Sequence, residues 1–410
     1  MAGGGVDGVS TEGPLAGIRV LEFGTLIAAP FATRLLADFG AEVIKVESPG
    51  VGDPLRNWRQ LHKGTSLWWS VQARGKKSIV LDLKSPKGVE VAMRLAARAD
   101  IVVENFRPGG LEKLGLGWDQ LSGINPDLVM VRISGYGQTG PYRARPGFGA
   151  IGEAMGGLRY TTGEAGRVPA RVGVSIGDSL ASLHAVIGAL IAVMRVKQGQ
   201  GLGQVVDVSL VESVYNLMES MIPEYSVTGQ LRERAGGALP GISPSNTYPT
   251  ADGAFVVIAG NSGAIFRRLM AAIGRADLGE DPSLARNAGR VARNGELDAA
   301  ITRWTSGLPM DQVLAELERA EVPASKIHSA ADIVRDPHFQ ARDMLLQVEL
   351  ADGQAMTMPG IVPKLSDSPG QVRWLGPELG QHTREILETL GYGEDQISVL
   401  MQPLRGTPAD

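Results

Sequence analysis

The feature that most constrains the fold is an alternation of short apolar strands with helical segments along the first two hundred residues. Strand-like runs are predicted at residues 18–23, 42–46, 78–82, 101–104 and 128–133. Helical spacing of apolar side chains is predicted between them, at residues 30–39 and 86–97. Strands joined through helices need crossover connections, which give a mostly parallel sheet covered on both faces. We therefore predict an α/β protein with a doubly wound, Rossmann-like large domain.

The pattern of predicted elements changes in the second half of the chain. A long apolar helix is predicted at residues 179–196, a strand at 204–210 and a helix at 211–228. Gly, Pro, Ser and Asn then crowd together, which marks a linker. Further strands and helices follow, at residues 255–259, 264–273, 297–306, 310–320, 345–350 and 355–358, with a helical end after 381. We predict a flexible tail at 1–13, a large domain at 14–228, a linker and small α+β domain at 229–335, and a return to the large domain at 336–410.

Composition removes several kinds of chemistry. The 410 residues include no Cys and five His, and no two His stand four apart as in a helical zinc pair. We therefore expect no metal site. Forty basic residues against 44 acidic ones predict no broad attraction to nucleic acid or to anionic membranes. Residues 180–194 are too short to span a bilayer comfortably, and the Gly-rich N-terminus is unlike a signal peptide. We therefore expect the protein to be a cytoplasmic enzyme.

Two nucleotide-binding motifs fail on inspection. The turn after the first strand, residues 23–30, has one Gly and lacks the G-x-G-x-x-G pattern of a dinucleotide site. Residues 74–78 are only superficially similar to a P-loop, because Ser70 and Lys77 stand where that motif needs Gly and Ser or Thr.

A series of segments in fixed order carries a more specific signal. They read PLAGIRVLEF at 14–23, AP at 29–30, DFGAEVIKVE at 38–47, GKKS at 75–78, ENFRPG at 104–109, SGYGQTGP at 134–141, GD at 177–178 and LGQHT at 379–383. This series closely resembles the class III CoA-transferases, of the formyl-CoA transferase and carnitine CoA-transferase type, from about residue 14 to the C-terminus. The resemblance implies acyl-CoA and carboxylic acids as substrates, no tightly bound cofactor, and an interlocked homodimer.

The resemblance assigns the chemistry to Asp178. A carboxylate can be the nucleophile in CoA transfer between acids, through an anhydride and an aspartyl-CoA thioester. Asp178 stands where a helix is predicted to begin, so the helix dipole favours its ionised form. Gly177 removes a side chain beside it. A helix N-cap is the alternative role for this Asp, and the two roles are compatible.

The resemblance also implies which residues bind CoA. Thr25, Ile27 and Ala28 are expected near the pantetheine and the thioester, and Tyr136 and Gln138 in an active-site wall. The positions that match nucleotide-binding segments are Ser48, Ala73, Arg74, Lys76, Asn105, Phe106, Arg107 and Lys113. The basic ones suit phosphates. The alternative role of the basic residues is ordinary surface charge in contact with water. The alternative roles of Asn105 and Phe106 are a turn residue and a core aromatic residue.

Departures from the family narrow the activity. Racemases of this superfamily place a His where this chain has Phe148, and phenylalanine cannot shuttle a proton. The formyl-CoA transferases have a Gln at the position of Ile27 and a four-glycine loop, and this chain lacks both. These departures argue against formyl or oxalyl substrates. The chain resembles more closely the family members that use succinyl-CoA with small dicarboxylates, and this resemblance implies a transferase of that kind; a racemase-like isomerase and a non-catalytic CoA-binding protein are the alternatives. Candidate cations for an acid tail are Arg143, Arg145, Arg159 and Arg171.

Overall fold

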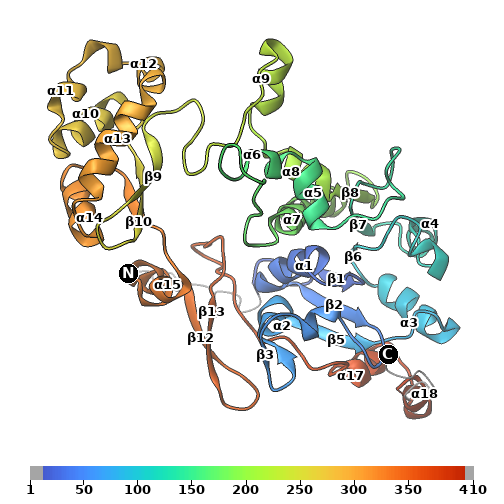
Figure 1. Ribbon diagram of the computed structural model, residues 1–410. Helices are drawn as coiled ribbons and strands as arrows, with labels where there is room; N and C mark the ends of the chain where they lie inside the picture. Colours follow the sequence, from blue (N-terminus) through green and yellow to red (C-terminus); the bar gives the residue numbers. More distant parts are fainter. Residues whose placement is uncertain (1–12, 402–410) are drawn as a thin grey trace, which may run out of the picture. The chain divides into compact units, whose positions relative to one another are not determined.

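The computed structural model describes residues 13–401, and the largest sheet within them is a six-stranded parallel sheet (Figure 1). The strands lie in the order β5-β2-β1-β6-β7-β8. Their bounds are β1 Arg19–Glu22, β2 Glu42–Glu47, β5 Lys76–Val80, β6 Ile101–Glu104, β7 Val129–Ser134 and β8 Val205–Ser209. Every neighbouring pair in this sheet is parallel, so the predicted α/β fold with crossover connections is confirmed.

Helices cover both faces of the sheet because successive side chains of each strand point to opposite sides. α1 Ala28–Asp38 and α7 Ile176–Lys197 share one core with Val20, Val43 and Val131. The other core joins Leu21, Val102 and Met130 to helices α3 Pro86–Ala96, α4 Trp118–Ile124, α17 Thr383–Thr389 and α18 Glu394–Leu400. This is the doubly wound arrangement that the alternating sequence pattern predicts.

α7 has two different faces. Ala181, Ala185, Ala189 and Ala192 are buried against the sheet. Leu183, Ile187, Ile191 and Met194 are 46–62% exposed on the other side of the helix. By length and composition α7 is the one helix among residues 13–401 that could cross a membrane, but its alanine face belongs to the core beside α1.

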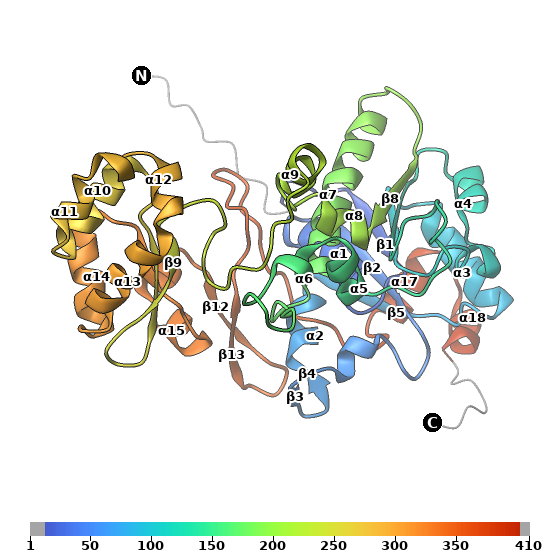
Figure 2. The ribbon, with the colours of Figure 1, turned by 45° about the horizontal axis from the view of Figure 1, so that its top comes forward.

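The chain separates into two compact units. Unit 1 holds the chain up to Leu158, Val172–Glu219 and everything from Met344, and unit 2 holds Arg159–Arg171 and Ser220–Asp343. The remaining elements of unit 1 are η1 Pro54–Asn57, β3 Leu61–His62, β4 Thr65–Ser66, α2 Leu67–Gln72, η2 Glu112–Leu114, α5 Gly149–Met155, α8 Leu210–Tyr215, β12 Leu345–Glu349 and β13 Ala355–Pro359. β12 and β13 form a hairpin (Figure 2). The domains predicted at 14–228, 229–335 and 336–410 stay a prediction, and the predicted tail lies almost wholly outside the described residues.

Unit 2 has an antiparallel sheet and a core of its own. Its strands are β9 Ser245–Pro249, β10 Phe255–Ala259 and β11 Ala324–Lys326, with β10 in the centre. Its helices are α9 Met221–Thr228, α10 Gly263–Ala272, α11 Ala276–Gly279, α12 Asn287–Ala292, α13 Asn294–Thr305, α14 Met310–Arg319, α15 Ala330–Arg335 and α16 Pro337–Ala341, with η3 Pro282–Leu284. α6 Leu158–Thr161 begins at the boundary between the units. Phe266, Leu269 and Leu297 are fully buried in this core.

The single helix predicted at residues 211–228 is wrong. The segment forms α8 and α9, separated by residues 216–220. Glu219 has a φ of 49°, a left-handed conformation that cannot continue a right-handed helix. The break also marks the passage from unit 1, which ends there at Glu219, to unit 2, which resumes at Ser220.

Candidate active site

Asp178 lies in the first turn of α7, the helix that packs beside α1. The helix begins at Ile176 after the N-cap residue Ser175, so Asp178 is its third residue. The alternative role of Asp178 as the N-cap is therefore wrong. An acidic side chain in the first turn still interacts favourably with the positive end of the helix dipole. The residue is half-buried.

The Asp178 carboxylate lies against Gly149, the first residue of α5. A Cβ atom at position 149 would stand 2.1 Å from Asp178 Oδ2, which is far inside contact distance. A Cβ atom at Gly177 would likewise stand 2.9 Å from the carbonyl oxygen of Gly149. These two glycines let the first turns of α5 and α7 touch. The space that Gly177 opens is thus filled by the backbone at Gly149.

A serine connects the Asp178 turn to the start of α1. The Ser182 hydroxyl oxygen lies 2.7 Å from the carbonyl oxygens of both Asp178 and Ala28. Ser182 is fully buried, and Ile27 and Ala28 are buried beside it. The structure therefore brings two of the predicted thioester-contacting residues, Ile27 and Ala28, into the neighbourhood of the predicted nucleophile.

The loop that leads into α1, residues 24–27, is fixed by side chains from other segments. Asn105, which follows β6, accepts a hydrogen bond from the Thr25 N–H and donates one to the Thr25 carbonyl, both at 2.9 Å. The Gln72 amide at the end of α2 donates to the Ile27 carbonyl at 3.2 Å. Thr25 is exposed while its backbone is held. Asn105 thus supports the loop from the side of β6.

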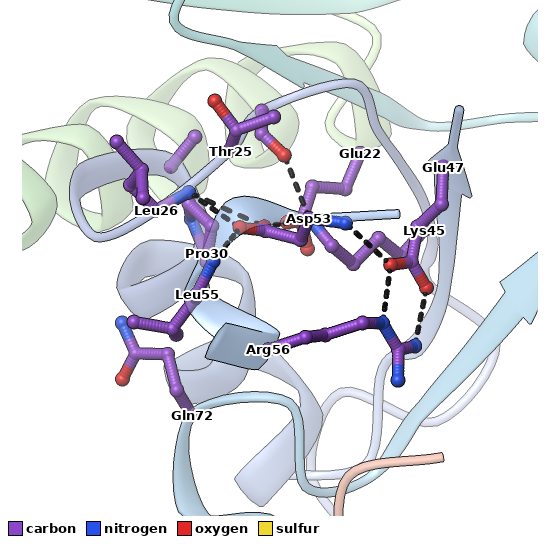
Figure 3. Close-up of polar contacts among 12 residues, drawn as sticks. Glu22, Thr25, Leu26, Pro30, Lys45, Glu47, Asp53, Leu55, Arg56 and Gln72 are labelled. Carbon is purple, nitrogen blue, oxygen red and sulfur yellow. Dashed lines mark hydrogen bonds and ion pairs between the residues drawn. The ribbon is translucent and has the colours of Figure 1, made fainter. Parts of the chain in front are cut away.

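Two charged side chains hold the same loop from the side of β2 (Figure 3). Lys45 Nζ donates to the carbonyl oxygen of Gly24 at 2.7 Å. Both carboxylate oxygens of Asp53 accept from the Leu26 N–H, at 3.0 and 3.2 Å. Lys45 and Asp53 also form an ion pair with each other at 2.8 Å.

Lys45 and Asp53 belong to a buried charge cluster beneath the start of α1, made of Glu22, Lys45, Glu47, Asp53, Arg56 and Lys76. Glu22 pairs with Lys45 at 2.7 Å and Lys76 at 2.8 Å, and the Thr33 hydroxyl donates to it at 2.5 Å. Burial alone would raise the pKa of Glu22, but the two lysine charges outweigh burial and hold that pKa at about 2. Glu22 is therefore a fully buried carboxylate that stays ionised.

The cations of the cluster respond differently to burial. Burial acts to lower the pKa of Lys45, but the charges of Glu22, Asp53 and Glu47 outweigh it, so the pKa is raised. Burial lowers the pKa of Lys76 to about 8, because the charge of Glu22, which Lys76 binds directly, does not make up for burial and the charge of Lys45 opposes its own. Three carboxylates and three cations leave the cluster without net charge.

The sequence matches CoA-transferase family III over residues 15–383. The chain belongs to this family. It is 51% identical to the succinyl-CoA–D-citramalate CoA-transferase of Chloroflexus aurantiacus, over 94% of this chain and 96% of the relative. It is 36% identical to the succinate–glutarate CoA-transferase of Agrobacterium fabrum, over 92% of this chain and 96% of the relative. A CaiB/BaiF family protein from Brucella suis has a similar structure, with a TM-score of 0.80 and 35% identity over 92% of this chain and 100% of that one. The predicted class III CoA-transferase is confirmed.

Two of the predicted phosphate-binding side chains of this transferase are engaged inside the protein. Arg74 is 1% exposed, and its Nε and Nη2 atoms donate to the two carboxylate oxygens of Asp38 at 2.8 Å each. Lys76 is fully buried; it binds Glu22, and its Nζ donates to the Pro30 carbonyl at 2.7 Å. Neither side chain faces solvent, so neither is available to bind a phosphate in this structure. Ala73 beside them is also buried.

The other predicted nucleotide-binding positions are accessible to different degrees. Ser48, Arg107 and Lys113 are exposed, which suits contact with a ligand in solution. Phe106 is half-buried and packs against the core on the α3 side of the sheet, as its alternative role predicts. Its N–H donates to the buried Glu104 at 2.6 Å. Burial raises the pKa of Glu104 to about 7 despite its ion pair with Arg132.

The predicted active-site wall follows β7. Tyr136 packs edge-on against Tyr142, with ring centroids 6.0 Å apart. The Gln138 N–H donates to Asp207, and the Gln138 side-chain nitrogen is buried without a hydrogen-bond partner among residues 13–401. A Cβ atom at Gly135 would stand 2.9 Å from Gly147, so this loop packs on the segment that leads to Gly149.

The remaining candidates differ in exposure and in the unit to which they belong. Arg143 and Arg145 are exposed, and Arg145 stacks over the ring of Tyr142 at 3.7 Å. Arg159 and Arg171 belong to unit 2. Phe148, the residue that argues against a racemase, is 68% exposed. Within residues 13–401, no three His, Asp or Glu side chains form a group fit to hold a metal ion.

Sequence reasoning missed the residues that hold the site together. It gave Gly149 no role and did not single out Glu22, Lys45, Asp53 or Ser182. A signal for part of the cluster is present: Glu22 and Lys45 interrupt apolar strands that are predicted to be buried. Charged residues in such strands are rare unless they are paired. Their partners come from distant segments, so the pairing itself is visible only in the fold.

Proposed function

We propose that this class III CoA-transferase moves CoA from succinyl-CoA to a small dicarboxylic acid, with Asp178 as the nucleophile. The observation that carries the proposal is the Asp178 carboxylate in the first turn of α7, close to the start of α1 and in contact with Gly149. The named acceptors of related transferases, D-citramalate and glutarate, are small dicarboxylates and support the same class of acceptor here.

The reaction proceeds by exchange of acyl groups on Asp178. A carboxylate oxygen of Asp178 attacks the thioester carbonyl of succinyl-CoA, the C–S bond breaks, and a mixed anhydride forms with release of the CoA thiolate. The thiolate then attacks the aspartyl carbonyl and expels succinate, which leaves an aspartyl-CoA thioester. The acceptor carboxylate attacks that carbonyl and releases the thiolate again. Attack of the thiolate on the acceptor carbonyl of the new anhydride gives acceptor-CoA and restores Asp178.

The CoA carrier is proposed to lie along the segments that the family resemblance assigns. Thr25, Ile27 and Ala28 face the pantetheine and thioester, and Tyr136 and Gln138 line the wall. Of the nucleotide-binding positions, Ser48, Asn105, Arg107 and Lys113 are accessible and keep that role. The exposed Arg107 and Lys113 can contact phosphates without breaking an internal ion pair. No bound cofactor besides the CoA substrate enters the reaction.

We also propose a homodimer in the cytoplasm. The exposed stripe of Leu183, Ile187, Ile191 and Met194 on α7 is an apolar surface of the kind that subunit contacts cover. Light scattering that gives the mass of one chain at micromolar concentration would contradict the dimer.

The test of the chemistry is an Asp178→Asn variant assayed with succinyl-CoA and a panel of D-citramalate, L-malate, glutarate and mesaconate. The wild-type protein is expected to form the acyl-CoA of at least one acceptor, and to lose activity with hydroxylamine only when succinyl-CoA is present. Asp178→Asn is expected to be folded and inactive. An active and hydroxylamine-insensitive variant would exclude the mechanism. Exchange of the α-hydrogen with deuterium, without acyl exchange, would instead favour a racemase-like isomerase.

A further inference from the structure

The 24–27 loop contains a residue in an unfavourable backbone conformation. Leu26 has a φ of 65°, in the left-handed region that bulky residues rarely adopt. Such a conformation persists when surrounding contacts over-determine it. The Leu26 N–H donates to both carboxylate oxygens of Asp53, so this one side chain determines the direction of the strained peptide.

Asp53 is itself fixed more firmly than a surface carboxylate. It is 1% exposed, its own N–H donates to Glu47 Oε2 at 2.9 Å, and its carboxylate caps the short helix η1 by accepting from the Leu55 N–H at 2.9 Å. Lys45 Nζ lies 2.8 Å from Asp53 Oδ2 and also donates to the carbonyl of Gly24. The carboxylate therefore has no room to turn away from the loop.

The loop in turn connects to the nucleophile through buried contacts. It leads directly into Ala28, whose carbonyl oxygen lies 2.7 Å from the Ser182 hydroxyl. The same hydroxyl lies 2.7 Å from the carbonyl of Asp178. A displacement of the loop would change the position of the start of α1 relative to the first turn of α7.

We propose that Asp53, together with Lys45, is a positioning residue for acyl transfer: it holds the 24–27 loop so that the thioester carbonyl is aligned with Asp178. This inference rests on the proposed role of Asp178 as nucleophile. Asp53 is buried, and its carboxylate binds Leu26, Leu55 and Lys45, so it is proposed to act through the loop and not by contact with the substrate. Its contribution is to the geometry of attack, where a misplacement of about 1 Å costs on the order of 100-fold in rate.

The experiment compares Asp53→Asn with Asp100→Asn. Asp100 has the same kinds of partner, because it accepts from the backbone N–H of Arg19 at 2.8 Å and pairs with Lys197 at 2.7 Å; its side chain is 19% exposed, whereas that of Asp53 is fully buried. It lies just before β6, at the opposite end of the strands, and it contacts no part of the 24–27 loop. The two variants therefore lose the same kind of charge and keep the same kind of hydrogen bond.

The expected results separate positioning from mere stability. Asp53→Asn is expected to lower kcat with succinyl-CoA by about 10- to 100-fold, with the KM for succinyl-CoA within about threefold of wild type. Asp100→Asn is expected to keep kcat within about twofold. Assays run at 10 °C, with the folded fraction measured by circular dichroism, so that unfolding does not enter the rate. A wild-type kcat in folded Asp53→Asn, or equal losses in both variants, would overturn the proposal.

A second variant covers failure of the first to fold. Asp53→Ser keeps a good cap for η1 but is too short to reach both Leu26 and Lys45. A reduced kcat at an unchanged KM supports positioning, and a wild-type kcat overturns it. The parent mechanism is judged separately by Asp178→Asn: if that variant is active, the proposed function fails whatever Asp53 does, and if it is inactive, only the positioning role is at stake.

Discussion

Lys76 and Lys77 are neighbours in β5, yet they lie on opposite faces of the sheet and in different environments. Lys76 points under α1, is fully buried, and pairs with Glu22 at 2.8 Å. Lys77 points toward the α17 side, is 24% exposed, and pairs with Glu42 at 3.2 Å and Glu385 at 2.7 Å. The distances are similar, so the difference lies in the surrounding medium.

The comparison teaches that burial decides what an ion pair can do. In water the attraction is screened, and exposed pairs add little to stability. Inside the protein each charge depends on its partner, because a lone buried charge is costly. On the Lys76 face, two other members of the charge cluster also hold the backbone: Lys45 binds the carbonyl of Gly24, and Asp53 accepts from the N–H of Leu26. The buried face therefore links stability to the geometry of the proposed active site, and the exposed face does not.

The largest effect is expected from Glu22→Gln, which breaks the buried side of the comparison. The neutral side chain removes the carboxylate shared by Lys45 and Lys76 and leaves the buried Lys76 without the ion pair it forms at 2.8 Å. Loss of one partner from a buried pair costs about 3–5 kcal/mol in free energy of unfolding. Urea unfolding at pH 7 measures it. A loss below about 1 kcal/mol would mean that the cluster contributes no more than a surface pair.

The same residue gives this prediction a pH dependence. The pKa of Glu22 is about 2 in the folded protein against an ordinary value of 4.5, because the lysine charges outweigh the effect of burial. The folded state thus binds fewer protons than the unfolded state between these values. Stability from Glu22 is complete above pH 4.5 and is lost as the pH falls toward 2, by about 3 kcal/mol in all. The stability gap between wild type and Glu22→Gln should therefore narrow from pH 5 to pH 3, and a constant gap would contradict it.

The two faces also show what sequence can predict. The parallel sheet follows from local alternation, so β6 at Ile101–Glu104 agrees residue for residue with the predicted strand. The burial of Arg74 and Lys76 was not predicted, since their partners Asp38 and Glu22 are 36 and 54 residues away. The break between α8 and α9 was missed because Leu217 and Met218 continue an apolar pattern through it.

The site was predictable only where a motif carries it. Asp178 is proposed from the resemblance, but its place as the third residue of α7 depends on where the helix begins, and helix ends are poorly specified by sequence. Gly149 matters because α5 and α7 make contact there, beside Asp178. The sequence around Gly149 and around Asp178 does not predict this contact. Composition and periodicity describe elements, and the site is made from contacts between them.

Gly149→Ala sharpens the comparison by changing the α1 and α7 side of the sheet without replacing a charged residue. The new Cβ would stand 2.1 Å from Asp178 Oδ2, so the carboxylate must rotate away from its position. We expect kcat/KM with succinyl-CoA to fall by about 10- to 100-fold, since alignment of the nucleophile is lost. The ion pairs of Glu22 are with Lys45 and Lys76 and do not involve residue 149, so thermal stability should change far less than in Glu22→Gln.

Gly123→Ala is the matched control for this variant. Gly123 lies inside α4, and a Cβ atom there meets nothing within 4 Å. The substitution should keep wild-type kcat/KM and stabilise the helix by up to about 1 kcal/mol. If Gly149→Ala keeps full activity as well, the carboxylate of Asp178 tolerates displacement, and its observed position is not the one that the reaction needs.

The smallest effect is expected from Lys77→Met, the exposed counterpart of the buried pair. The substitution removes the ion pairs with Glu42 and Glu385. Water can then solvate these two carboxylates, because both are more than 40% exposed. The free energy of unfolding should change by less than about 1 kcal/mol, and 0.5 M NaCl should shrink even that difference through screening. Urea unfolding at low and high salt, with Glu22→Gln measured alongside, provides the test. If Lys77→Met lowers the free energy of unfolding by nearly as much as Glu22→Gln, then burial does not explain the difference between the two faces.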